Sequence, residues 1–116
     1  MTDLVRIAGP AGSEWVEHPR FEGIFLSRLL TSLDNPHASL NVVRVPPGKE
    51  IGSHAHEGQV ETVFVLAGEC FLTISGEVHP FTKGQVVALP ASVPHSLRNI
   101  GDQMVELLTI FTPPLV

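Results

Sequence analysis

Three histidines and one glutamate have the residue types and the spacing of a metal-ligand set: His54, His56, Glu61 and His95. Side chains two positions apart on an extended strand point to the same side, so His54 and His56 can reach one ion from one strand. Glu61 lies an odd number of positions from both, so an unbroken strand would direct it to the other side. The intervening turn-forming segment Glu57-Gly58-Gln59 can reset this alternation.

His95 belongs to a later segment, which follows the turn-rich stretch Pro90-Ala91-Ser92-Val93-Pro94. Imidazole nitrogens and a carboxylate oxygen together form a ligand set that iron, manganese, nickel, copper and zinc all accept. Glu61 supports a bound cation, because a carboxylate within an apolar strand needs one to remain charged. The four residues therefore predict one divalent transition metal ion, whose identity stays open among these metals.

The segments around these residues resemble the two signature motifs of the cupin superfamily. The first motif spans 48–68 and is matched at every position by Gly48, His54, His56, Glu61 and Gly68. The resemblance extends from about Val42 to Pro113, which is most of the chain.

The second motif spans 84–99 and is matched by Gly84, Pro90, His95 and Asn99. Ser92 stands where the family usually has glycine. Ser92 is not at a ligand position, so this departure predicts only a mildly strained local turn, since non-glycine residues rarely adopt a positive φ.

The resemblance implies an all-β fold, the double-stranded β-helix or jelly-roll barrel of a small monocupin (cupin 2, RmlC-like type), with residues 1–116 as one domain. It also implies that the four residues bind their ion inside the barrel. Related cupins include dioxygenases, isomerases, decarboxylases, cyclases and binding proteins without activity, so the fold does not decide the function. Two hypotheses remain: a metal-dependent enzyme, dioxygenase-like or isomerase-like, acting on a small metabolite, or a non-catalytic binding or sensing protein. No residue is identified as a catalytic acid or base.

The pattern of the whole chain independently favours strands. Ten glycines and ten prolines separate short apolar runs, as in an all-β sandwich or barrel. The predicted strands are Ile24–Leu30, Ser39–Val45, Val60–Ala67, Cys70–Ser75, Val78–Thr82, Gln85–Leu89, His95–Asn99 and Met104–Phe111. The segment Phe25–Leu33 also has leucines at helical spacing, but Gly23 and Asp34-Asn35-Pro36 at its ends favour a strand.

Two of the predicted strands, Val60–Ala67 and Met104–Phe111, are apolar on both faces. In the first, Phe64 and Leu66 lie on the face opposite Glu61. A strand that is apolar on both sides must be covered on both sides, and too little chain remains to supply a second layer. The sequence therefore predicts a homodimer, an assembly common among small cupins.

Bulk properties limit the remaining partners and the location. The formal charge is −5 with no basic cluster, which argues against binding nucleic acid or an anionic membrane. No apolar run approaches the roughly 20 residues of a membrane span, and the start, MTDLVRIAGPAG, lacks the pattern of a signal peptide. One cysteine, Cys70, fits a reducing compartment, so we expect a cytoplasmic protein. The expected partner is a small-molecule ligand or substrate, as the resemblance to cupins implies.

Several further residues receive structural interpretations. Cys70 is expected to be a buried, unreactive thiol, and Asn99 a turn residue. The sequence does not determine whether Gln59 and Arg98 line the binding cavity. The three histidines outside the motifs are expected at the surface: His18, His37 and His79.

Overall fold

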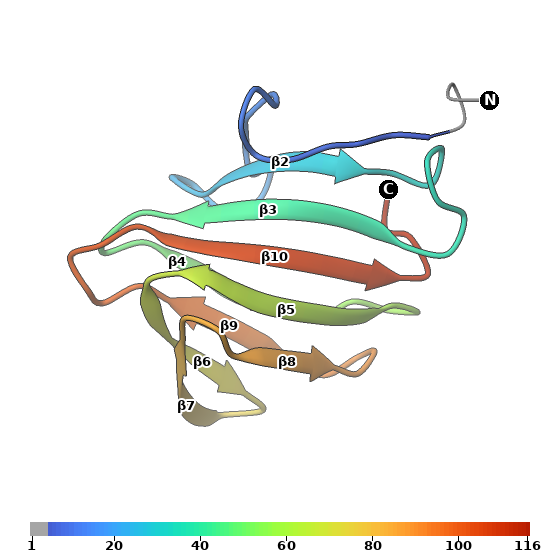
Figure 1. Cartoon of the computed structure of the whole chain (residues 1–116). Helices are drawn as coiled ribbons and strands as arrows, with labels where there is room; N and C mark the ends of the chain where they lie inside the picture. The colour runs from blue at the N-terminus through green and yellow to red at the C-terminus, as the bar shows by residue number, and fades with distance from the viewer. Residues whose placement is uncertain (1–4) are drawn as a thin grey trace.

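The computed structural model describes residues 5–116, which form ten β-strands and no helix (Figure 1). Met1–Leu4, on which part of the signal-peptide expectation rests, lies outside the described residues. Within residues 5–116, no helix is long and apolar enough to cross a membrane.

The strands form two antiparallel sheets. The larger sheet contains, in spatial order, β1 (Val16–Glu17), β2 (Phe25–Leu30), β3 (Ser39–Val45), β10 (Val105–Thr112), β5 (Val60–Ala67) and β8 (Val86–Leu89). The smaller sheet contains β4 (Glu50–His54), β9 (His95–Arg98), β6 (Glu69–Ile74) and β7 (Glu77–Thr82). Many neighbouring strands are distant in sequence, as the jelly-roll connection requires, and the predicted all-β, double-stranded β-helix fold is confirmed.

The hydrophobic core lies between the inner faces of the two sheets. Leu107 on β10 is in register with Val43 on β3 and Val65 on β5, and all three side chains are buried. Leu72 and Leu97 meet them from the smaller sheet. Each buried aliphatic side chain contributes roughly 1.5–3 kcal/mol of transfer free energy, so this layer holds the sheets together.

The predicted strands agree closely with the observed ones. Ser39–Val45 and Val60–Ala67 have the predicted bounds, and the other six differ by one residue at one or both ends. The strand interpretation of the ambiguous segment is correct, because β2 covers Phe25–Leu30. Sequence analysis missed β1 and β4, and β4 carries His54. Ile51 is the single strongly apolar residue of β4, so its pattern showed no alternation.

Two residues of the motifs shape the ends of strands. Asn99 is fully buried, and its Nδ2 donates hydrogen bonds to the carbonyl oxygens of Val45 and Gln103 at 2.8 and 2.7 Å. This confirms its expected structural role in a turn. Gly68 has a φ of 82°, and a Cβ there would lie 2.7 Å from the carbonyl oxygen of Met104, so only glycine fits.

The outer face of the larger sheet is partly covered by the chain itself. The N-terminal segment runs beside β2 (Figure 1), where Ser13 and Ser27 share a hydrogen bond of 2.7 Å. Trp15 stacks under the guanidinium of Arg44, 4.0 Å from its ring centroid. This cover lies over β2 and β3, whereas the prediction of an uncovered outer face concerned β5 and β10. On β5 and β10, apolar side chains of this face stay partly exposed.

Candidate metal centre

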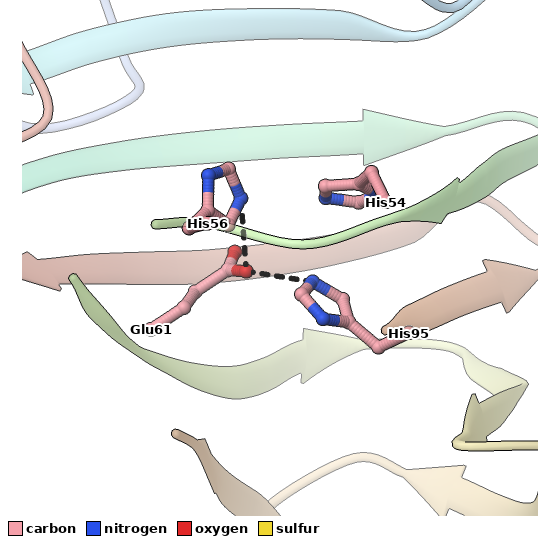
Figure 2. Close-up of side chains that lie close together, drawn as sticks. All are labelled: His54, His56, Glu61 and His95. Atoms are coloured by element: carbon pink, nitrogen blue, oxygen red, sulfur yellow. Dashed lines mark hydrogen bonds and ion pairs between the residues drawn. The ribbon is translucent and has the colours of Figure 1, made fainter. Parts of the chain in front are cut away.

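The structure brings all four predicted ligands together (Figure 2). His54 ends β4, His56 lies in the following loop, Glu61 lies on β5, and His95 begins β9. One ligand atom from each residue lies within 4.8 Å of all the others. Bonds of about 2.1 Å to one octahedral ion would separate its ligand atoms by about 3.0–4.2 Å. The four groups are therefore close enough for side-chain movements to bring them onto one ion.

The local path of the chain differs from the prediction in one respect. His54 and His56 do not share a strand, because β4 ends at His54. The chain bends at Glu57 and Gly58, where Gly58 has a φ of 88°, before β5 begins. The predicted turn is thus present, and it turns Glu61 inward with Val63 on the same side of β5.

Glu61 and His95 are buried against each other, with 8% and 7% of their surfaces exposed. The Nε2 atom of His95 lies 3.0 Å from Oε1 of Glu61, and its Nδ1 atom lies 3.0 Å from the carbonyl oxygen of Val93. Both partners accept hydrogen bonds, so the protonated ring, with a hydrogen on each nitrogen, satisfies both contacts. Burial lowers the pKa of His95, but the hydrogen bonds to Glu61 and Val93 outweigh burial, and the pKa is raised.

His54 and His56 have the opposite protonation preference. Burial is the largest influence and lowers the pKa of both rings, outweighing the Gly52 hydrogen bond that raises the pKa of His54 and the charge of Glu61 that raises the pKa of His56. The Nδ1 atom of neutral His54 donates to the carbonyl oxygen of Gly52 at 2.8 Å, which leaves the Nε2 lone pair free. His56 directs Nε2 toward Oε1 of Glu61 at 3.5 Å. Neutral imidazole with its other nitrogen held by a backbone carbonyl is the form that binds metals.

Ser92 holds the loop that carries His56. Its φ of 68° is left-handed, so the strained turn predicted at this position is present. The backbone N–H of Ser92 donates to the carbonyl oxygen of His56 at 2.9 Å, and its hydroxyl donates to Glu57 at 2.5 Å. Serine therefore contributes a link between the two ligand loops that glycine would lack.

The four residues line a cavity of about 300 Å³ inside the barrel. Most of its remaining lining is apolar and includes Leu26, Val43, Val63, Leu72, Leu107 and Phe111. An ion held by the four side chains would therefore face this space. The donor set, the burial and the hydrogen bonds to backbone carbonyls all fit a divalent transition metal ion.

The cavity also contains residues that sequence analysis did not identify. His18 was expected at the surface, but it is half-buried, lines the cavity and lies against Phe21 with ring centroids 4.8 Å apart. Asn41 lies two positions before the core residue Val43 on β3, so both side chains face inward. This spacing could have been read from the sequence. Arg28 lines the cavity from β2.

The other singled-out residues lie away from the cavity, as far as residues 5–116 show. Gln59 and Arg98 do not line it, and neither do His37 and His79. Cys70 is buried, and its thiol donates to the carbonyl oxygen of Phe81 at 3.4 Å. Burial raises the pKa of Cys70 to about 11, which agrees with the expected unreactive thiol.

Comparison with known proteins identifies the family. A family model described as the cupin domain matches residues 41–111, more than half of the chain. The chain is a cupin. It is 32% identical over 68 residues to the oxalate-binding protein of Thermotoga maritima, a match covering 59% of this chain and 56% of that relative. The matched part thus spans just over half of the relative's length.

Solved cupin structures share the fold. A structure described as a predicted oxalate decarboxylase from Thermotoga maritima superposes with a TM-score of 0.83 at 23% identity, covering 92% of this chain and 98% of the other. An RmlC-like cupin from Shewanella frigidimarina superposes with a TM-score of 0.78 at 20% identity, covering 94% and 91%. Because both identities are below 25%, the two superpositions establish only that this cupin has the jelly-roll fold.

Proposed function

We propose that this cupin is a metal-dependent enzyme, dioxygenase-like or isomerase-like, that acts on a small metabolite in the barrel cavity. The main observation in support of this proposal is that the four side chains of the candidate metal centre line that cavity. An ion held there would be reachable by a molecule in the cavity. The proposed cofactor is one divalent ion of iron, manganese, nickel, zinc or copper.

Each ligand has a separate task in this proposal. His54, His56 and His95 would supply neutral nitrogens, and Glu61 would supply one negative charge that lowers the net charge of the site. When bound, such an ion polarises an oxygen of the substrate or exchanges electrons with it. The apolar lining excludes water from the bound molecule. The cavity volume of about 300 Å³ lies at the small end of the range of about 300–1,000 Å³ for ligand sites, which favours a small metabolite.

A second candidate function is non-catalytic binding or sensing of a small molecule. The observation that favours it is the small number of acid–base side chains in the cavity: outside the four-residue cluster, the titratable lining side chains within 5–116 are those of His18, Arg20 and Arg28. A matched relative is named an oxalate-binding protein, in keeping with this alternative.

The deciding experiment is elemental analysis of protein purified without chelator, followed by X-ray absorption to count the ligands. We expect about one equivalent of metal in the native protein and much less in Glu61→Gln. His79→Gln is the matched control and should retain the metal, because His79 lies outside the cavity lining. An ion with open positions, followed by turnover in a substrate screen, supports the enzyme. A zinc ion closed by four protein ligands supports binding, and native protein without metal contradicts the metal-dependent enzyme.

We further propose a cytoplasmic homodimer formed through the outer face of β5 and β10. Phe64 and Leu108 are in register on this face and remain partly exposed. Leu66 and Ile110 extend the same apolar surface. A second copy of this face would cover it, and the single cysteine, Cys70, is compatible with a reducing compartment.

A further inference from the structure

The cavity has an excess of positive charge at its mouth. Arg20 and Arg28 both line it and are exposed, whereas Glu61 is the one acidic side chain among the described lining residues. Glu61 already contacts His95 and His56, at 3.0 and 3.5 Å. Within residues 5–116, no carboxylate forms an ion pair with either arginine. The two guanidinium groups are therefore available to an anion that enters the cavity.

His18 connects these arginines to the candidate metal centre. The backbone N–H of Arg20 donates to Nδ1 of His18 at 3.0 Å, so in the neutral ring Nε2 carries the hydrogen and can donate it. Burial is the largest cause that lowers the pKa of His18, followed by the charges of Arg20, Arg28 and His56. His18, Arg20, Arg28 and His56 all line the same cavity. One small molecule can therefore reach the arginines and the metal centre together.

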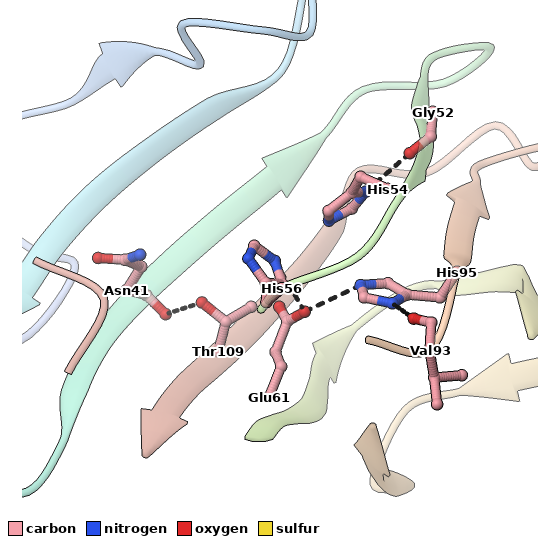
Figure 3. Close-up of polar contacts among 8 residues, drawn as sticks. All are labelled: Asn41, Gly52, His54, His56, Glu61, Val93, His95 and Thr109. Atoms are coloured by element: carbon pink, nitrogen blue, oxygen red, sulfur yellow. Dashed lines mark hydrogen bonds and ion pairs between the residues drawn. The ribbon is translucent and has the colours of Figure 1, made fainter. Parts of the chain in front are cut away.

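Asn41 supplies a second, independent observation. Asn41 is 7% exposed and lines the cavity, and within residues 5–116 its Oδ1 is the one buried side-chain nitrogen or oxygen atom without a hydrogen-bond partner. Figure 3 shows Asn41 beside the cluster, with Thr109 bonded to its backbone oxygen at 3.4 Å and its amide without a contact. Burying an unpaired carbonyl oxygen costs about 1–3 kcal/mol, so this atom calls for a donor from a bound molecule.

Asn41 lies directly beside Arg28. The two residues are paired in register across β2 and β3, on the inner face of the larger sheet. Their neighbours on that face, Leu26 and Val43, belong to the hydrophobic core. An anion-binding group and a hydrogen-bond acceptor therefore stand next to each other on an otherwise apolar wall.

We infer that the cavity recognises a small hydroxycarboxylate, with its carboxylate on Arg28 and Arg20 and its hydroxyl donating to Oδ1 of Asn41. A carboxylate fits better than a phosphate, because phosphate sites commonly use helix N-termini or glycine-rich backbone cradles, and residues 5–116 contain no helix. This inference rests on the proposed function in one respect only, which is that the cavity is the ligand site.

The test measures binding of three probes by isothermal titration calorimetry, with both chelator-treated and zinc-loaded protein. The probes are 2-hydroxy-4-methylpentanoate, its uncharged amide, and 4-methylpentanoate, which lacks the hydroxyl. We expect the hydroxy acid to bind at least about tenfold more tightly than its amide, because the amide cannot form the charge-assisted hydrogen bond to the arginines. Arg28→Gln should remove this preference. Arg98→Gln, an equal change of charge outside the cavity lining, should preserve it.

Asn41→Leu tests the contact between the ligand hydroxyl and Oδ1 of Asn41. Measuring stability and binding preference together distinguishes this contact from a purely structural role. Removing a buried unpaired oxygen should leave the thermal midpoint unchanged or raise it, while abolishing the preference for the hydroxy acid over 4-methylpentanoate. A lowered midpoint with the preference retained would contradict the role of Asn41. Equal binding of acid and amide, or equal loss in Arg28→Gln and Arg98→Gln, would overturn the inference.

The two protein forms separate this inference from the proposed function. An arginine-dependent preference in chelator-treated protein supports the hydroxycarboxylate site even if the native protein contains no metal. Metal in the native protein together with binding that ignores Arg28 overturns the hydroxycarboxylate site and leaves the metal proposal standing.

Discussion

The Ser92 hydroxyl donates to the carboxylate of Glu57, across 35 positions of sequence, with Oγ 2.5 Å from Oε2. The backbone N–H of Ser92 adds a bond of 2.9 Å to His56. Serine pays a conformational cost here, since its φ is 68°. The contact thus joins the loop bearing His56 to the loop preceding His95 in spite of a strained backbone.

Substitutions at Ser92 should separate the strain from the hydrogen bond. Ser92→Ala loses the bond and keeps the unfavourable φ, whereas Ser92→Gly loses the bond and relieves the strain. We expect the glycine variant to have the larger free energy of unfolding, by about 1 kcal/mol, in urea denaturation. Both variants should bind metal more weakly than the native protein. An alanine variant more stable than the glycine variant would contradict this account.

Metal binding should release a proton from His95. In the metal-free site, Nε2 of His95 carries a hydrogen toward Glu61, and the pKa of His95 is raised. A metal must displace this proton, so affinity should fall as pH decreases from about 8 to 6, as the protonated fraction of His95 grows. Calorimetric titrations in buffers of different ionisation enthalpy count the protons released. If the heat of metal binding at pH 7 is the same in every buffer, no proton is released, which would contradict this prediction.

The stability of the metal-free protein should also depend on pH. The pKa values of His54 and His56 are lowered in the folded state, so the unfolded chain binds more protons as pH falls below about 6.5. Their contribution to the free energy of unfolding should therefore be lost with decreasing pH. His95, whose pKa is raised, opposes this change. The double variant His54→Gln/His56→Gln should lose less stability between pH 6.5 and 5 than the native protein, as followed by thermal unfolding.

Added metal should stabilise the fold by mass action. At a free metal concentration 100 times the Kd, the expected gain is about 2.7 kcal/mol, seen as a higher thermal midpoint that chelator reverses. Glu61→Gln should fold but show a much smaller gain, because an amide oxygen is a poorer ligand than a carboxylate. A midpoint that ignores metal and chelator in the native protein would count against the metal centre.

A charge on the outer face of β5 should prevent dimerisation. Phe64→Glu would bury an unpaired carboxylate in the proposed interface, which is costly, so sedimentation at micromolar concentration should show a monomer. Val78→Glu is a matched control, since Val78 on β7 is 59% exposed and outside that face. Circular dichroism checks that both variants fold. Native protein that sediments as a monomer would refute the dimer.

Local pattern explains how much of the fold the sequence predicted. Short apolar, β-rich runs between turn signals gave the bounds of β3 and β5. β4 escaped prediction because it is held by pairing with β9, with Glu50 opposite Arg98, and not by an apolar pattern of its own. Strand pairing is a tertiary property, which local periodicity cannot report.

The sequence by itself determined the ligand types, their motif spacing and the turn at Glu57-Gly58-Gln59 that lets Glu61 face inward. Tertiary structure decided which distant residues lie next to these ligands. His95 reaches Glu61 across 34 positions because β9 and β5 belong to facing sheets. His18 enters the cavity, and Arg28 stands beside Asn41, through register between strands that are separate in the chain. Residue type and spacing govern which groups can bind a metal, whereas strand pairing and sheet packing govern which distant groups surround it.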